Sequence, residues 1–145
     1  MGRFFTLFAV AATLAVTAAA DAQTKEYPGF KATRTKKLPL KLDVDFDNVF
    51  LRTIITDEIP SLVKDAGGGT IRVKPLPGAG VTLTSRFTIK AKQITLEELM
   101  NKLCEDKNWG WYVKNGPAGS QDDGAIFITT NPKEKGYKEG TAPKQ

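Results

Sequence analysis

The stretch RFTIKAKQITLEELMNKLC, residues 86–104, joins a strand pattern directly to a helix pattern. Apolar and polar residues alternate from Arg86 to Lys92, which is the period of a half-buried strand. Thr95 and Glu98 have the spacing of a capping box, in which each side chain bonds the backbone amide of the other residue at a helix start. The helix presents one apolar stripe, formed by Leu96, Leu99, Met100, Leu103 and Cys104. The stretch therefore predicts a strand–helix unit of an α+β fold.

The residues on either side extend this unit to the element order β-α-β-β-α-β-β. Strand patterns recur at four further places, residues 40–46, 71–74, 109–114 and 125–129. Apolar residues at three- and four-residue steps predict a first helix between residues 50 and 66, which Pro60 should kink or split near Ile59. We therefore expect one small α+β domain over residues 38–131, in which two helices pack on one face of a small mixed sheet.

The N-terminal residues have the pattern of a secretory signal. A basic start precedes an apolar run that is too short to span a bilayer, and Ala20 and Ala22 give the small-residue pattern that a signal peptidase cuts. We expect residues 1–22 to be removed, which leaves a periplasmic or secreted protein without a stable membrane span; an uncleaved N-terminal anchor is the alternative. The polar segments beside the domain are predicted to be a flexible tether, residues 23–37, and a disordered tail, residues 132–145.

The composition limits the chemistry that the chain can perform. Histidine is absent, so the commonest general base and metal ligand is missing, and Cys104 is the only cysteine. The net charge is +5, but the lysines and arginines are scattered among acidic residues, which argues against nucleic-acid binding. We therefore expect no enzyme activity, no cofactor and no metal. Cys104 is predicted to be buried as a small hydrophobe, with an intermolecular disulfide as the alternative.

One candidate binding surface is basic. Arg86, Lys90 and Lys92 alternate with apolar residues and therefore share one face of their strand. Together with Arg72 and Lys74, on a strand that we expect to be adjacent, they would form a basic sheet surface for an acidic partner or an anionic polymer. A solvated outer face without a partner is the alternative interpretation.

The other candidate surface is aromatic. Trp109 and Trp111 share one face of their predicted strand, where they would offer a platform to a glycan or to a partner side chain. Large aromatic residues at alternating positions more often belong to a core, so burial is the competing interpretation. Tyr112 points to the opposite face of the same strand and is predicted to be exposed, and both Trp111 and Tyr112 are candidate partner-binding residues.

The order of these elements resembles the short N-terminal domain of secretins and of TonB-dependent transducers, which has related units in small exported proteins with planctomycete-like sequences. The second half carries the resemblance, with a strand leading into Thr-Leu-Glu-Glu, an aromatic strand, a turn and a short apolar strand, here residues 87–100, 109–113 and 125–128. Residues 44–51 match the first half more loosely, and Pro60 and the two tryptophans depart from the pattern. The resemblance implies a non-catalytic module that docks other envelope proteins.

Two functions follow from these observations. The first is an exported module that binds another cell-envelope protein, either by strand addition at a free sheet edge or through the basic face. The alternative is a domain that binds a cell-wall glycan or another anionic polymer with the strand that carries Trp109 and Trp111.

Overall fold

The computed structural model describes residues 25–134 and 136. Its helices are α1 (Pro28–Ala32), α2 (Leu51–Thr53), α3 (Ile59–Asp65) and α4 (Leu96–Glu105), with π-helical turns η1 (Thr33–Lys37) and η2 (Ile54–Glu58). Its strands are β1 (Lys41–Phe50), β2 (Val73–Pro75), β3 (Arg86–Thr95), β4 (Gly110–Val113) and β5 (Ile126–Thr129). The α+β class is confirmed. The predicted signal peptide, residues 1–22, lies outside the described residues.

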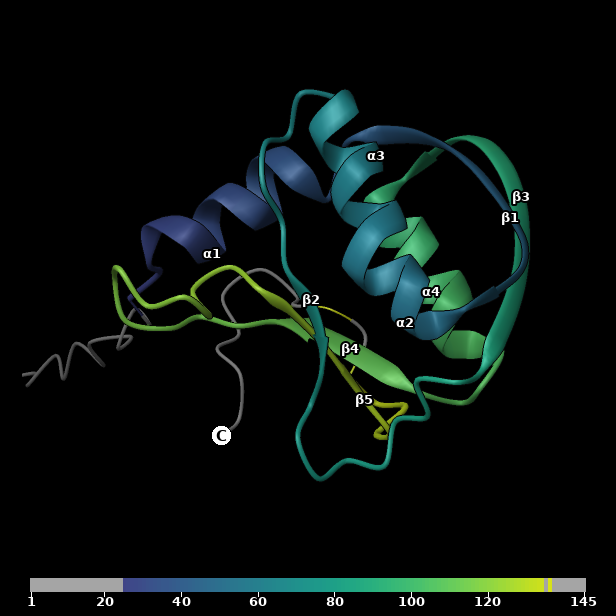
Figure 1. Cartoon of the computed structure of the whole chain (residues 1–145). Helices are drawn as coiled ribbons and strands as arrows, with labels where there is room; N and C mark the ends of the chain where they lie inside the picture. The colour runs from purple at the N-terminus through teal and green to yellow at the C-terminus, as the bar shows by residue number, and fades with distance from the viewer. Residues whose placement is uncertain (1–24, 135, 137–145) are drawn as a thin grey trace, which may run out of the picture.

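The strands form two sheets, where one was expected. β1 and β3 pair antiparallel as a two-stranded ribbon. β5 lies between β4, to which it is antiparallel, and β2, to which it is parallel. Helices α2, α3 and α4 lie in the space between the curved ribbon and the three-stranded sheet (Figure 1). The helices therefore do not share one face of a single sheet, because β2 pairs with β5 and not with β3.

Two β-bulges curve the ribbon. The register of β1 and β3 shifts twice, and residues with left-handed backbone lie at both shifts, Asn48 (φ 54°) and Gln93 (φ 55°). The Asn48 amide donates to Thr88 Oγ1 at 3.0 Å, and the Gln93 amide donates to Asp43 Oδ1 at 2.9 Å. The bond from Gln93 holds the pKa of Asp43 below its usual value. The bond from Asn48 fixes the bulge at the other register shift. Because bulges add local twist and bend, the ribbon curves around the helices.

Asn48 gives a matched test of this curvature. Asn48→Val should lower the free energy of unfolding by about 1–3 kcal/mol, because a β-branched residue is strained at positive φ. Asn48→Gly should leave stability unchanged or slightly higher, since only backbone atoms of Asn48 make the bonds to Thr88 and Arg86. Urea unfolding followed by far-UV circular dichroism measures both variants. Equal losses in the two would mean that the backbone conformation is not what stabilises the bulge.

The two predicted helices form as their sequences indicate. The capping box of α4 is confirmed, with Glu98 N–H to Thr95 Oγ1 at 3.1 Å and Thr95 N–H to Glu98 Oε2 at 2.7 Å. Those bonds lower the pKa of Glu98. The first helix runs without interruption of its helical backbone from Leu51 to Asp65, so the predicted split near Ile59 does not occur; its hydrogen bonding changes there from the π-helical η2 to α3. Pro60 lies in the first turn of α3, where its missing N–H costs least.

The segment predicted to be a flexible tether is folded from residue 25 onward, so that prediction is wrong for this part. α1 and η1 pack on the loop between β4 and β5, and Phe30 is only 1% exposed. Asp123 caps α1 by accepting from Gly29 N–H at 2.8 Å and from Phe30 N–H at 2.9 Å. Thr33 Oγ1 donates to the Gly124 carbonyl at 2.7 Å. The residues that hold α1 in place, Asp123 and Gly124, are more than 90 positions away in the sequence. The N-terminal segment itself therefore shows no apolar periodicity that would predict its folding.

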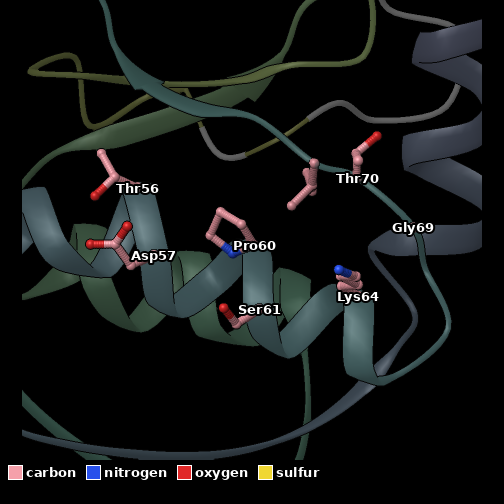
Figure 2. Close-up of a pocket in the computed structure, with 8 residues that line it drawn as sticks. Thr56, Asp57, Pro60, Ser61, Lys64, Gly69 and Thr70 are labelled. Atoms are coloured by element: carbon pink, nitrogen blue, oxygen red, sulfur yellow. The ribbon is translucent and has the colours of Figure 1, made fainter.

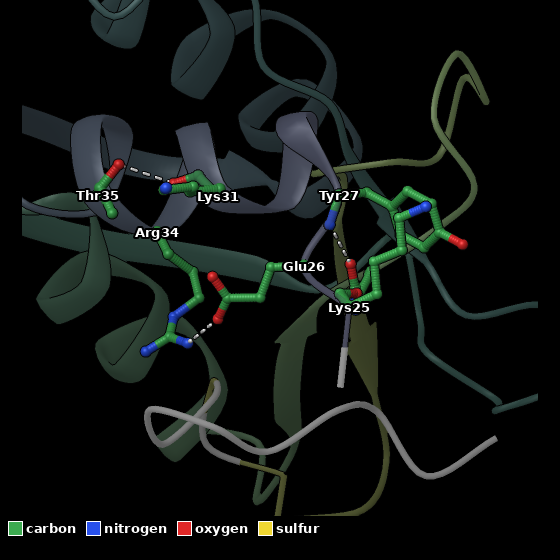
Figure 3. A network of polar contacts seen from close by, with 7 residues as sticks. Lys25, Glu26, Tyr27, Lys31, Arg34 and Thr35 are labelled. Carbon is green, nitrogen blue, oxygen red and sulfur yellow. Dashed lines mark hydrogen bonds and ion pairs between the residues drawn. The ribbon is translucent and has the colours of Figure 1, made fainter. Parts of the chain in front are cut away.

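Polar contacts also join the residues of this N-terminal segment to one another. Arg34 Nη1 lies 3.5 Å from Glu26 Oε1, and the Lys25 ammonium lies 5.3 Å from the centroid of the Tyr27 ring (Figure 3). Thr35 Oγ1 donates to the Lys31 carbonyl one turn earlier. These exposed pairs stabilise the segment little compared with the cap and the buried Phe30.

The segment predicted to be a disordered tail also has defined contacts at its start. Trp111 N–H donates to the Glu134 carbonyl, and Gly136 N–H donates to the Trp111 carbonyl, both at 2.7 Å. Residues 134 and 136 therefore lie along the edge of β4 that does not face β5. These contacts are hydrogen bonds between backbone atoms. Because they do not require apolar side chains, the sequence of this segment does not indicate them. Residues 137–145 of the predicted tail lie outside the described residues.

Candidate functional site

Basic side chains of β3 and α4 meet at a surface hollow of about 510 Å³, named here the basic hollow. It is lined by Arg86, Phe87, Thr88, Ile89, Lys90, Lys102 and Asp106. Three of these residues are cationic and one is acidic. The hollow therefore has the charge and the breadth to receive an acidic segment rather than an apolar one.

Arg86 has its guanidinium fixed in place at one end of the hollow. Its centre lies 3.8 Å from the centroid of the Phe50 ring, and its Nη1 donates to the Asn48 carbonyl at 3.0 Å. Phe50 is 40% exposed, the only large apolar residue in the described part of the chain with such exposure. Stacking on an aromatic face and one backbone bond leave the other guanidinium donors available to a ligand.

The lysines of the hollow are held less tightly. Lys90 Nζ lies 3.5 Å from Asp45 Oδ1, and the two side chains are 62% and 78% exposed, so this pair contributes little. Lys102 comes from α4 and forms no ion pair with any described residue. Lys92, the third residue of the predicted basic face, is exposed on β3 but does not line the hollow. Arg86 and Lys90 are therefore brought together as predicted, and Lys92 stands apart.

The predicted extension of the basic face to β2 does not occur. Arg72 and Lys74 belong to the strand region that pairs with β5, so they are not neighbours of β3. Lys74 Nζ lies 2.6 Å from Asp122 Oδ1, and Arg72 Nη1 donates to the Gln121 carbonyl at 3.0 Å. The residues of the predicted basic surface are consequently divided between the ribbon and the region of the three-stranded sheet.

The aromatic strand is not the exposed platform that the alternation suggested. Trp111 is 1% exposed, and its Nε1 donates to Asn101 Oδ1 at 2.9 Å. Trp109 is half-buried just before β4, with its ring 6.4 Å from that of Phe87. The prediction of Trp111 as a partner-binding residue is wrong, because the three-stranded sheet and α4 enclose its ring within the core.

Tyr112 is half-buried rather than exposed. Its ring stacks on Phe127 with centroids 5.6 Å apart and planes inclined by 17°. Burial, and to a smaller extent the charge of Glu134, raises the pKa of the phenol. The Tyr112 ring is thus committed to a neighbouring strand of its own sheet.

Cys104 is buried, as predicted. It is 3% exposed, and its Sγ lies 3.6 Å from the Gly110 carbonyl. Burial, with a smaller contribution from the charge of Glu105, raises the pKa of the thiol to about 12. A thiol with so high a pKa is a poor nucleophile and is not accessible for pairing with another chain.

A second hollow of about 260 Å³ lies between the helix η2–α3 and the segment that follows it (Figure 2). Thr56 and Asp57 lie at one end and Lys64 near the other (Figure 2). Asp57 and Lys64 are its lining charges, so the hollow is balanced in charge. The Thr56 hydroxyl already donates to the Arg52 carbonyl at 2.9 Å. This hollow offers a partner much less electrostatic attraction than the basic hollow does.

Sequence reasoning found the strand residues of the basic hollow and missed the helix residues. Lys102 lies on α4, Asp106 follows it by four positions as the C-cap of that helix, and Glu98 precedes Lys102 by the same step. Residues at this spacing share one helix face, so a charged stripe was detectable. The missing information was the packing of α4 against β3, which places the stripe beside Arg86 and Lys90.

Neither a metal-binding cluster nor a membrane-spanning helix is found among the described residues. No group of three or more His, Cys, Asp or Glu residues in that part of the chain could hold a metal ion. No helix there has both the length and the apolar character needed to cross a membrane.

No protein-family model matches the chain, and neither a curated protein nor a solved structure matches it significantly.

Proposed function

We propose that this chain is an exported, non-catalytic module that docks an acidic segment of another cell-envelope protein in the basic hollow. The observation that carries the proposal is that Arg86, Lys90 and Lys102 meet at one hollow against a single lining acid, Asp106. Complementary charge of this kind steers association and selects acidic partners.

The arrangement of the three cations supports docking. The Arg86 guanidinium is already positioned by Phe50 and by the Asn48 carbonyl, so little side-chain entropy is lost when it binds a carboxylate. The exposed pair of Lys90 with Asp45 is weak, and Lys90 can exchange that partner for another. Lys102 has no ion pair within residues 25–134 and 136 to give up.

Strand addition at a free edge is less well supported. The outer edge of β4 is partly occupied, because residues 134 and 136 bond to Trp111 there. The ribbon of β1 and β3 carries two bulges and several exposed charges, and both features discourage pairing with another strand. The basic face therefore remains the better candidate of the two docking modes.

Two features of the sequence also support an exported docking module. The basic start, apolar run and Ala20–Ala22 pattern favour export, and the resemblance to the short N-terminal domain of secretins and TonB-dependent transducers favours docking to an envelope protein. The glycan alternative depended on an exposed pair of aromatic rings. With Trp111 1% exposed, that pair is not formed.

A labelled acidic peptide tests the proposal directly. We expect a fluorescein-labelled hexaglutamate peptide to bind the full chain, as measured by fluorescence anisotropy. The double variant Arg86→Glu/Lys90→Glu should bind at least about tenfold more weakly, which corresponds to about 1.4 kcal/mol. The same variant should lose the proteins that the unmodified chain captures from an envelope extract.

The matched control is Lys31→Glu/Lys36→Glu, which makes the same change in net charge at two exposed positions of the N-terminal helical segment. This control should bind the peptide as the unmodified chain does. If both double variants lose affinity equally, binding depends only on net charge, and the basic hollow is not the docking site.

A further inference from the structure

A third hollow, which shares no lining residue with the basic hollow, lies between η1, the segment before β2 and the loop before β5. Its volume is about 350 Å³. Its lining residues are Lys37, Thr70, Ile71, Arg72, Gly119, Ser120, Gln121, Asp123, Gly124 and Ala125. It brings together three segments that are distant in sequence, and it is named here the Lys37–Arg72 hollow.

Two cations line this hollow without a counter-ion. Lys37 Nζ donates to the carbonyl of Thr70. Arg72 Nη1 donates to the carbonyl of Gln121 at 3.0 Å and to its Oε1 at 3.3 Å. These acceptors are all neutral, and neither cation forms an ion pair with a residue in the described ranges.

The carboxylates nearby are already engaged. Asp123, the one acid in the lining, accepts the amide protons of Gly29 and Phe30 and so caps α1. Asp122, its neighbour in the chain, is paired with Lys74. Burial lowers the pKa of Lys37, and no compensating acid offsets this burial. The lining thus carries one excess positive charge that is partly withdrawn from water.

We propose that the Lys37–Arg72 hollow binds a phosphate-type oxyanion between the Lys37 ammonium and the Arg72 guanidinium. A guanidinium offers a planar fork of donors that fits a tetrahedral oxyanion, and an ammonium adds a point charge. The Ser120 hydroxyl, which accepts from the Asp122 amide at 3.2 Å, retains its O–H to donate to such a group. The site is separate from the basic hollow, so the proposal does not depend on the proposed docking function.

Titration of the ¹⁵N-labelled full chain tests the site by nuclear magnetic resonance. Inorganic phosphate and glycerol 1-phosphate are added in separate series, with the ionic strength held constant by sodium chloride. We expect saturable shifts of the amide signals of Arg72, Ser120 and Gly124, with an affinity in the millimolar range or tighter. Tighter binding of glycerol 1-phosphate would identify a phosphate monoester as the preferred source, and tighter binding of inorganic phosphate would identify the free ion.

Variants separate a built site from general charge screening. Arg72→Gln and Lys37→Gln should each weaken phosphate binding at least about tenfold. Lys36→Gln, next to the site but exposed, should bind as the unmodified chain does. Arg72→Gln should also leave binding of the hexaglutamate peptide unchanged, which keeps this test independent of the basic hollow. The proposal is overturned if neither anion gives saturable shifts, or if all three variants bind alike.

Discussion

Replacing Trp111 by alanine is expected to lower the free energy of unfolding by about 3–5 kcal/mol. The ring is 1% exposed in the core, and its removal also leaves Asn101 Oδ1 without the indole donor that it has at 2.9 Å. A Cβ atom added at Gly136 would lie 2.9 Å from the Trp111 ring. The backbone of Gly136 therefore packs closely on that ring. Urea unfolding followed by far-UV circular dichroism gives the value.

Trp109→Ala is the natural comparison, because Trp109 is the half-buried tryptophan of the same region. It should lose less stability than Trp111→Ala does. If Trp109→Ala proved the more damaging change, the assignment of Trp111 to the core and of Trp109 to its margin would be reversed. The aromatic strand would then again be a candidate for ligand binding.

The second large effect concerns alkaline pH. The pKa of the Cys104 thiol is raised from 9.0 to about 12 in the folded chain, mainly by burial. Below pH 9 both the folded and the unfolded chain hold the proton. Above it the unfolded chain loses the proton first, so stability falls as the pH rises through the folded pKa. Three units at 1.36 kcal/mol each give a loss of about 4 kcal/mol by pH 12.

The variant Cys104→Ala isolates this contribution. Lysine and tyrosine titrations are common to both proteins, so only the difference between their two stability curves reports on the thiol. We expect the curves to be parallel below pH 9 and to converge above it, as the unmodified chain loses its alkaline contribution. Curves that stay parallel up to pH 12 would show that the thiol ionises in the folded chain as readily as in the unfolded one.

Much of the fold follows from local patterns. The capping box at Thr95 and Glu98 and the buried stripe of α4 were detectable, since both depend on residues within one or two helical turns. The change of helical hydrogen bonding just before Pro60 was detectable for the same reason, although the predicted split does not occur. The division of the strands between two sheets was not, because the choice of β5 as the partner of β2 depends on contacts between residues about 50 positions apart.

The candidate site was predictable to a similar extent. Alternation placed Arg86 and Lys90 on the exposed face of one strand, and both line the basic hollow. The same alternation gave no means of deciding that Trp111 is enclosed while Lys90 is exposed, because burial depends on which neighbouring elements cover each face. The Lys37–Arg72 hollow had no signal at all, since its residues come together only when the N-terminal helix docks.

The docking of that helix has a consequence for the order in which the chain folds. Its bonds join Tyr27 to Asn115 and Gly29 to Asp123, across 88 and 94 positions of sequence. Chain segments so far apart meet slowly, because a long loop must close before either gains a contact. A chain that emerges from a ribosome or a translocation channel with its N-terminus first therefore exposes Phe30 to water until residue 123 has also emerged. The earliest part of the domain to appear is among the last to become protected from proteases and from hydrogen exchange.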